Sequence, residues 1–596
     1  MKLFTTMSQA IVCATLLGGV TTGAYSEQSE SAEATVYHSE VIADRLLDRE
    51  WTEGWDQGET RYSEAATRGG LLRVYLSDSV EWDEDSLRVN GRTLAELRET
   101  FEVPWHRRVV LDETLGVAKL EIRFHDLEMI NRNALVVVNH EGQRFRHRVS
   151  PRRLPASLGY AAVDRAAGEL VLFITRQEKA VSELEYVRLN HQALTPADES
   201  QAIQWYGNVG RIVAPLDDVP GHGRPQFVEV GLAGTGGRAI ALAGDFRVLD
   251  RPFSVGMYFG DLDELAELGF NTKLDYHPRL TEDALNEYSD RGMYLLGRVF
   301  GSRYADTAEP EVIAEHPAIY ALYGFDEPDV KDYRVEDVPL RRRVGVTGME
   351  VEEQQRRFRS EQPNHLTYVV VDHTFKPFNW HTYGPISDIM AIDPYPFVMT
   401  QEIRDGDNFK EAIGDVAQIM RRASEPRPMF ATLGLHYFEE RGGRMPDERE
   451  LRSQLYWALA EGSKGVNYYS WHFHRGGGLG DYPELHPYMA ELNALCNELG
   501  DRLLYSQPSN GVYEVSEGVD ARILVGRDGS LLVFAIARDA ADDLEATEVV
   551  VRMPAIDDAT VEVVDGDAQL KHSLDGDRLR LNVSATRPGV IVRVGP

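Results

Sequence analysis

Between residues 252 and 503 the chain alternates short apolar segments with amphipathic ones, and this alternation constrains the fold more than any other feature. It is typical of parallel strands joined by helices. We predict strands at residues 253–259, 271–276, 293–299, 319–324, 366–371, 388–392, 429–435 and 465–471. Eight repeats in about 250 residues predict a (β/α)8 barrel over residues 251–503.

Amphipathic segments follow most of these strands and are expected to form the helices around the barrel. They lie at residues 261–268, 282–289, 309–316, 351–360, 409–422, 447–462 and 486–499. The fifth connection, residues 372–385, is the exception. It is short and rich in proline and aromatic residues, so no helix is predicted there.

Alternating β patterns flank the barrel on both sides. Two sets of strands, at residues 71–77, 86–89, 118–124 and 134–139 and at residues 169–175, 186–190, 226–232 and 238–243, predict tandem β-sandwiches over 35–152 and 153–250. Val89-Asn90 corresponds to Leu189-Asn190 one hundred positions later, through duplication or through turn chemistry that any two sandwiches share. Strands at 521–525, 531–536, 547–552, 560–564 and 590–594 predict a C-terminal sandwich over 504–596.

The first residues have the layout of a signal peptide: Met1-Lys2, an apolar stretch at 10–20 and small residues at 22–24. We therefore expect residues 1–26 to be removed and the protein to be secreted or periplasmic. The apolar stretch is shorter than the roughly 20 residues that span a bilayer, so no membrane span is expected. Without the signal peptide only Cys496 is left, which excludes an internal disulfide.

The chain is strongly acidic, with 63 Lys and Arg against 96 Asp and Glu and a net charge of −33. Repulsion by this charge disfavours nucleic acid and anionic membranes as partners.

Active sites of such barrels lie where the strands end at their C-terminal side. Most of our candidates follow the eight predicted strands, and one lies in the fifth connection: Tyr258, Asp275, Arg298, Asp326, Glu327, Asp372, His373, Tyr383, Asp393, Tyr395, His436, Tyr437, Trp471 and His474. His472 and His474 alternate, so only one of them is expected to face the site. Sugars offer apolar faces to aromatic rings and hydroxyls to Asp, His and Arg, so an oligo- or polysaccharide is the predicted partner. Neither a cofactor nor a metal site is expected, because no glycine-rich phosphate loop or HExxH-like spacing is present.

The strongest single motif is Asp326-Glu327-Pro328, directly after the fourth predicted strand. Two adjacent carboxylates at the end of a buried strand are desolvated and repel each other, so one of them should stay protonated near neutral pH. A protonated carboxyl is what cleavage of a glycosidic bond needs at the leaving oxygen. The alternative is an ordinary helix-entry turn whose carboxylates cap backbone N–H groups.

An adjacent Asp-Glu at the end of the fourth strand resembles the dyad of the hexosaminidases of glycoside hydrolase families 20 and 123. The resemblance covers the barrel and implies that Glu327 is the general acid. It also implies that Asp326 orients the 2-acetamido group of the substrate, which attacks in place of an enzyme nucleophile.

Three alternatives stay open at this point. Glu327 pairs with Asp393 or Asp275 as nucleophile or base, at a separation of roughly 5–5.5 Å for retention or roughly 6.5–9.5 Å for inversion. Arg334 and residues 341–343 form a basic cluster that either meets an anionic sugar or is a solvated surface. The protein is a noncatalytic carbohydrate-binding protein if these carboxylates point away from the mouth.

Overall fold

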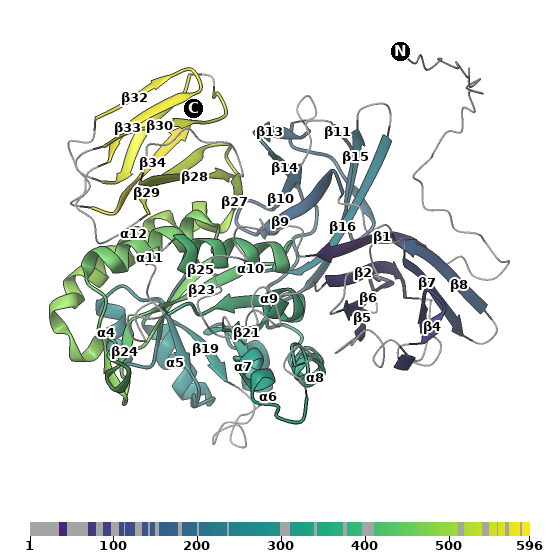
Figure 1. Ribbon diagram of the computed structural model, residues 1–596, viewed down its shortest axis with the longest axis horizontal. Helices are drawn as coiled ribbons and strands as arrows, with labels where there is room; N and C mark the ends of the chain where they lie inside the picture. Colours follow the sequence, from purple (N-terminus) through teal and green to yellow (C-terminus); the bar gives the residue numbers. More distant parts are fainter. Residues whose placement is uncertain are drawn as a thin grey trace, which may run out of the picture.

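We describe the fold from a computed structural model of the 596-residue chain (Figure 1). The described residues are 35–43, 70–78, 87–93, 95–96, 106–112, 114–124, 134–140, 143–149, 154–176, 181–198, 202–234, 238–298, 310–338, 343–372, 378–395, 410–509, 518–538, 547–556, 558–566, 571–583 and 587–595. The predicted signal peptide, residues 1–26, lies outside these residues. No helix in the described ranges is long and apolar enough to cross a membrane.

Eight parallel strands close into a barrel, as the sequence predicts. In order around the barrel they are β17 (Ser254–Tyr258), β18 (Thr272–Asp275), β19 (Tyr294–Arg298), β20 (Ile319–Asp326), β21 (Thr367–Val371), β22 (Ile389–Ile392), β23 (Met429–Gly434) and β25 (Gly465–Tyr469). Helices surround them: α4 (Leu262–Glu267), α5 (Glu282–Asp290), α6 (Pro310–Glu315), α7 (Pro328–Tyr333), α8 (Gly348–Glu361), α9 (Phe378–Tyr383), α10 (Val416–Ser424), α11 (Glu448–Ala460) and α12 (His486–Leu504). Tyr320, Tyr368 and Phe430 fill the barrel interior with edge-to-face contacts at 5.9 and 6.1 Å.

Two details of the barrel differ from the prediction. The fifth connection contains α9, because its aromatic residues are buried in packing and do not form an open loop. The eighth strand ends at Tyr469 rather than at Trp471, and a two-stranded ribbon of β24 (His436–Phe438) and β26 (Gly476–Gly478) follows the last two barrel strands. His472 and His474 consequently lie outside a strand, and both are exposed. The predicted alternation between them is wrong, because residues two positions apart on a strand point to the same face.

The two N-terminal β-sandwiches share one topology. The first contains sheets ordered β1-β2-β6-β5 and β4-β3-β7-β8, and the second has β9-β10-β14-β13 and β12-β11-β15-β16, which is the same order eight strands later. The strands of the first are Val36–Ala43, Gly70–Ser77, Leu87–Val89, Arg92–Thr93, His106–Asp112, Val117–Phe124, Ala134–His140 and Gln143–Val149. Those of the second are Ala156–Asp164, Glu169–Arg176, Val181–Leu189, Gln192–Leu194, Gln204–Tyr206, Val209–Pro215, Pro225–Gly234 and Arg238–Arg247. Asn90 and Asn190 occupy matching turns with φ of 52° each.

The C-terminal region is also a pair of antiparallel sheets, ordered β27-β28-β29-β34-β31 and β30-β33-β32. Its strands are Ser506–Ser509, Val519–Gly526, Leu531–Ala537, Thr547–Arg552, Thr560–Asp565, His572–Asp575, Arg578–Val583 and Gly589–Gly595. Its core is continuous with Tyr160 and Phe173 of the second sandwich, so these two regions pack on each other (Figure 1).

Candidate active site

Glu327 lies at the C-terminal end of β20 in a backbone conformation that is unusual for its residue type. Its φ is 46° and its ψ is 62°, the left-handed region, which costs a residue with a Cβ roughly 1–2 kcal/mol. It stands at the N-cap position of α7, yet its side chain makes no capping hydrogen bond. The helix-entry alternative therefore does not explain this carboxyl. Strain at a residue with no structural task is characteristic of functional sites.

Asp326 is held at the inner wall of the barrel by two tyrosines. A β-bulge between Tyr323 and Phe325 breaks the alternation of β20 and brings Tyr323 and Asp326 to the same side. Tyr323 then donates to Oδ1 of Asp326 at 2.6 Å, and Tyr276 donates to the same oxygen at 3.5 Å. Burial raises the pKa of Asp326, while Tyr323 and the charge of Arg298 act in the opposite direction.

Asp393, directly after β22, lies close enough to Glu327 for each of the two carboxyls to affect the pKa of the other. Burial raises the pKa of Glu327 to about 8, and the charges of Asp372 and Asp326 add to the rise. Burial, and then the charge of Glu327, also raise the pKa of Asp393 well above its ordinary range. Two interacting carboxyls in a desolvated site hold at least one proton near neutral pH. The raised pKa of Glu327 has the direction that the motif predicts.

Asp329 and Asn379 place Asp372 next to this pair. Asp329 is fully buried, and its carboxylate accepts from the backbone N–H of Asp372 at 3.1 Å and from Nδ2 of Asn379 at 3.0 Å. Asn379 also donates to the carbonyl of Asp372 at 2.5 Å. These contacts join the first turn of α7 to the end of β21, so the charge of Asp372 acts on Glu327 from a fixed position.

Aromatic side chains form the wall next to the carboxyls. Burial raises the pKa of Tyr469 to about 12, and the charges of Asp326, Glu327 and Asp393 add to the rise, so its hydroxyl lies near all three. Tyr395 packs on Tyr469 with ring centroids 5.9 Å apart. Half-exposed tyrosines beside acids offer a sugar both an apolar face and a hydroxyl group.

The cations that act on this cluster come from two elements. Arg298, at the end of β19, lowers the pKa of Asp326, and Lys331 and Arg334 at α7 act on Asp326 and Glu327 in the same direction. Nε of Arg298 is buried without a hydrogen-bond partner. These cations do not reverse the effect of burial, because the pKa values of all three carboxyls stay raised.

Three predicted site residues do not join the cluster. Asp275 accepts from the backbone of His277 at 2.8 Å, and after burial its charge raises the pKa of Tyr288 on α5, so it faces the helix layer. Tyr383 is fully buried and donates to Asp332 at 2.6 Å. Trp471 is 3% exposed and packs against His486, which leaves it no open face for a sugar.

The remaining predicted residues lie around the mouth or outside the described residues. Tyr258 is buried, with its hydroxyl 3.4 Å from that of Tyr323. His436 contacts Tyr395 and the backbone of Tyr469, and burial lowers its pKa to about 4, which keeps it neutral. Tyr437 shares a 3.1 Å hydrogen bond with Tyr482. His373 lies outside the described residues.

The predicted basic cluster, Arg334 and residues 341–343, lies only partly within the described residues. Arg343 donates to the carbonyls of Val338 at 2.7 Å and Tyr333 at 2.5 Å, so it stabilises the loop in which it lies. Residues 341 and 342 lie outside the described residues, and Arg334 is exposed. Within the described chain, no three His, Cys, Asp or Glu side chains are arranged to hold a metal ion.

The sequence analysis missed Tyr276, Tyr469, Asp329 and Asn379. A signal was present for one of them, because Asp326, Asp329 and Asp332 recur every third residue, which predicts one acidic face on the helix after the dyad. Tyr276 follows the selected Asp275, and Tyr469 stands two residues before the selected Trp471. Their inward direction depends on which face of the strand meets the barrel interior.

Comparisons with known proteins give only distant likenesses. No family model and no curated protein matches the chain. Among solved structures, a Bacteroides fragilis protein assigned as an α-galactosidase/melibiase aligns with a TM-score of 0.39 and 11% identity over 74% of this chain and 97% of its own. A β-galactosidase of Marinomonas ef1 gives 0.32 and 12% over 42% and 60%, and a β-glucuronidase of Ruminococcus gnavus in complex with D-glucuronic acid gives 0.31 and 12% over 79% and 99%. Likenesses this weak carry no argument, and the barrel rests on its own strand order.

Proposed function

We propose that the protein is a glycoside hydrolase that cleaves an oligo- or polysaccharide with Glu327 as the general acid. The observation that carries this proposal is the carboxyl of Glu327, whose pKa is raised to about 8 by burial and by the charges of Asp372 and Asp326. At neutral pH it is protonated and stands at the C-terminal end of a barrel strand, where barrel enzymes do their chemistry. It would give its proton to the leaving oxygen as the glycosidic bond breaks.

For the second group we propose Asp326, in a substrate-assisted reaction. Two tyrosines hold this carboxylate through one oxygen, Oδ1, so Oδ2 is available to a substrate N–H. Asp326 would accept from the 2-acetamido group of the sugar and orient its carbonyl oxygen toward the anomeric carbon. The bond from that oxygen to the carbon forms as the glycosidic bond breaks, and water later opens the ring that results.

The competing mechanism uses Asp393 as the second carboxylate. Burial and the charge of Glu327 raise the pKa of Asp393 well above its ordinary range, which disfavours the ionised form that a nucleophile or base needs. Asp393 is therefore better placed to share the proton of Glu327 than to attack the substrate.

Product analysis on a panel of aryl glycosides with and without a 2-acetamido group tests the proposal. We expect hydrolysis of 2-acetamido substrates, and a loss of about 10²–10⁴-fold in kcat/KM for Glu327→Gln. Asp326→Asn should lose a similar factor on these substrates. Equal activity of the parent and Glu327→Gln would exclude Glu327 as the acid. No hydrolysis by either, with retained sugar binding, would favour a noncatalytic carbohydrate-binding protein.

We also propose that the protein is exported to the periplasm or beyond, because residues 1–26 have the layout of a signal peptide. Cell fractionation with N-terminal sequencing of the mature chain tests this. An uncleaved chain in the cytoplasm would contradict it.

A further inference from the structure

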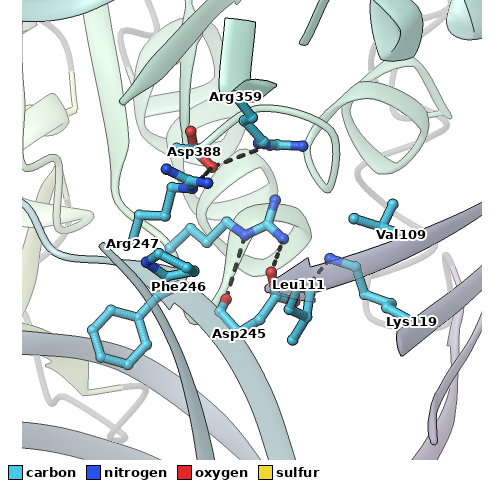
Figure 2. Close-up of a pocket in the computed structure, with 10 residues that line it drawn as sticks. Val109, Leu111, Lys119, Asp245, Phe246, Arg247, Arg359 and Asp388 are labelled. Atoms are coloured by element: carbon cyan, nitrogen blue, oxygen red, sulfur yellow. Dashed lines mark hydrogen bonds and ion pairs between the residues drawn. The ribbon is translucent and has the colours of Figure 1, made fainter. Parts of the chain in front are cut away.

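A charged cavity lies at the base of the barrel, where the two N-terminal sandwiches meet it (Figure 2). Its volume is about 30 Å³, and it is partly open to solvent. Its charged lining comes from the first sandwich (Lys119), the second sandwich (Asp245, Arg247) and the barrel (Arg359, Asp388, Arg427). Asp388 and Arg427 precede β22 and β23, so the cavity is at the opposite end of the barrel from Glu327.

The lining has an excess of positive charge, with four cations against two carboxylates. At the rim, Asp112 is near both Arg247 and Arg224, which adds one negative and one positive charge. Burial lowers the pKa of Arg247, and the nearby charges of Arg359 and Arg427 lower it further although Asp388 opposes them. A buried positive excess is unfavourable on its own, and in a chain of net charge −33 it is also locally unusual.

Two of these guanidinium groups use only part of their hydrogen-bonding capacity. Arg359 makes both of its hydrogen bonds, to the carbonyl of Ile386 at 2.7 Å and to Asp388 at 3.1 Å, from Nη2. Arg247 donates from Nη1 to the carbonyls of Gly223 at 2.6 Å and Pro363 at 2.9 Å. Figure 2 shows Arg247, Arg359 and Lys119 approaching the cavity from three sides. Nε of Arg247 also lies 3.8 Å from Asp388. The remaining N–H groups of Arg247 and Arg359 match the several acceptor oxygens of a small oxyanion.

We propose that this cavity binds a small doubly charged oxyanion, sulfate or hydrogen phosphate, between Arg359 and Arg247. The anion would balance the positive excess and link the sandwiches to the base of the barrel. Because only the folded chain brings these residues together, binding should stabilise the fold, by about 100-fold in the unfolding equilibrium at 100 times the Kd.

Thermal unfolding of the full chain in increasing sodium sulfate or sodium phosphate, at an ionic strength held constant with sodium chloride, tests the proposal. We expect a saturable rise in Tm that sodium chloride alone does not give, and heat of binding in calorimetric titration with the same salts. A Tm that rises only linearly with salt would overturn the proposal, since that is the general effect of excluded salts. Equal action of chloride would overturn it as well.

Two variants locate the site, with a control on the same helix. Arg359→Gln should lose the saturable rise, whereas Arg357→Gln, an exposed neighbour on α8 that pairs with Glu361 at 2.8 Å, should keep it. Val109→Asp places a carboxylate in the cavity lining and should also remove the rise, while Tm without anion stays at least as high as in the parent. Saturable binding that survives in Arg359→Gln and Val109→Asp would contradict this location.

Discussion

Buried carboxylates occur at both ends of the barrel, and they behave in opposite ways. At the base, Asp245 accepts from Lys119 at 2.7 Å and also from Arg427, and the pKa values of Asp245 and Asp388 fall below the ordinary range although burial opposes this. At the mouth, burial dominates and the pKa values of Asp326, Glu327 and Asp393 are all raised. Burial raises the pKa of any carboxyl, so the direction of the shift reports whether cations compensate it.

This difference separates acids that hold the structure together from acids that are available for chemistry. The base acids are ionised and link the sandwiches to the barrel, whereas the pKa values of the mouth acids are raised by burial that cations do not compensate, at a cost in stability. Such a cost is common at functional sites and is offset elsewhere in the fold.

The largest loss of stability that this comparison predicts follows a substitution at the base of the barrel. Asp245→Asn keeps the shape of the side chain but leaves Lys119 and Arg427 without this buried counter-ion, so we expect a loss of about 3–5 kcal/mol in the free energy of unfolding. Thermal or urea unfolding measures it. The matched control is Asp577→Asn, which breaks the exposed pair with Arg552 and should change the free energy of unfolding far less, because solvent screens this pair. Equal losses in the two variants would contradict a structural role for Asp245 and its partners Lys119 and Arg427.

The mouth predicts an effect of the opposite sign. The folded pKa of Glu327 is raised from 4.5 to about 8, so the contribution of its proton to stability is complete below pH 4.5 and is lost as pH rises through about 8. Glu327→Gln carries no charge at any pH. Its free energy of unfolding should therefore match that of the parent near pH 4.5 and exceed it by a few kcal/mol near pH 9, at about 1.4 kcal/mol per pKa unit.

Unfolding curves of both proteins between about pH 4.5 and pH 9 check this prediction. A difference that is independent of pH would mean that Glu327 has an ordinary pKa. The base acids should show the reverse dependence. Their contribution is present above the ordinary carboxyl range and is lost on acidification, through a pKa of about 2 for Asp388.

The smallest effect is a displacement of the activity profile. The charge of Asp372 helps to raise the pKa of Glu327, so Asp372→Asn should lower that pKa and move the alkaline limb of kcat/KM to lower pH. Asp275→Asn is the control, because Asp275 also stands at the end of a barrel strand, β18, but faces α5. If the alkaline limb moves equally in both variants, or in neither, the charge of Asp372 does not raise the pKa of Glu327.

The barrel was predictable because most of its strands are short apolar runs buried on both faces, and such runs are easily recognised in a sequence. The dyad was predictable for the same reason, since Asp326 and Glu327 end one of those runs. Strands of the sandwiches such as Val36–Ala43 and Arg578–Val583 were missed, because their polar residues weaken the pattern.

The inward-facing residues at the mouth were harder to predict. A one-residue change of register reverses the faces of a strand, so the sequence alone does not show whether Asp275 or Tyr276 faces the barrel interior. The bulge that aligns Tyr323 with Asp326 breaks the alternation on which the sequence argument depends. Likewise, the turn after Tyr469 takes Trp471 out of the strand and into the packing against α12.

The most direct test of the central claim is a titration of Glu327 itself. Infrared difference spectra between the parent and Glu327→Gln, recorded from about pH 4 to pH 10, report the carboxyl that the substitution removes. We predict a protonated carboxyl band at neutral pH that disappears with a midpoint of about 8. A carboxyl that is already ionised at neutral pH, with a midpoint near the ordinary 4.5, would contradict the account.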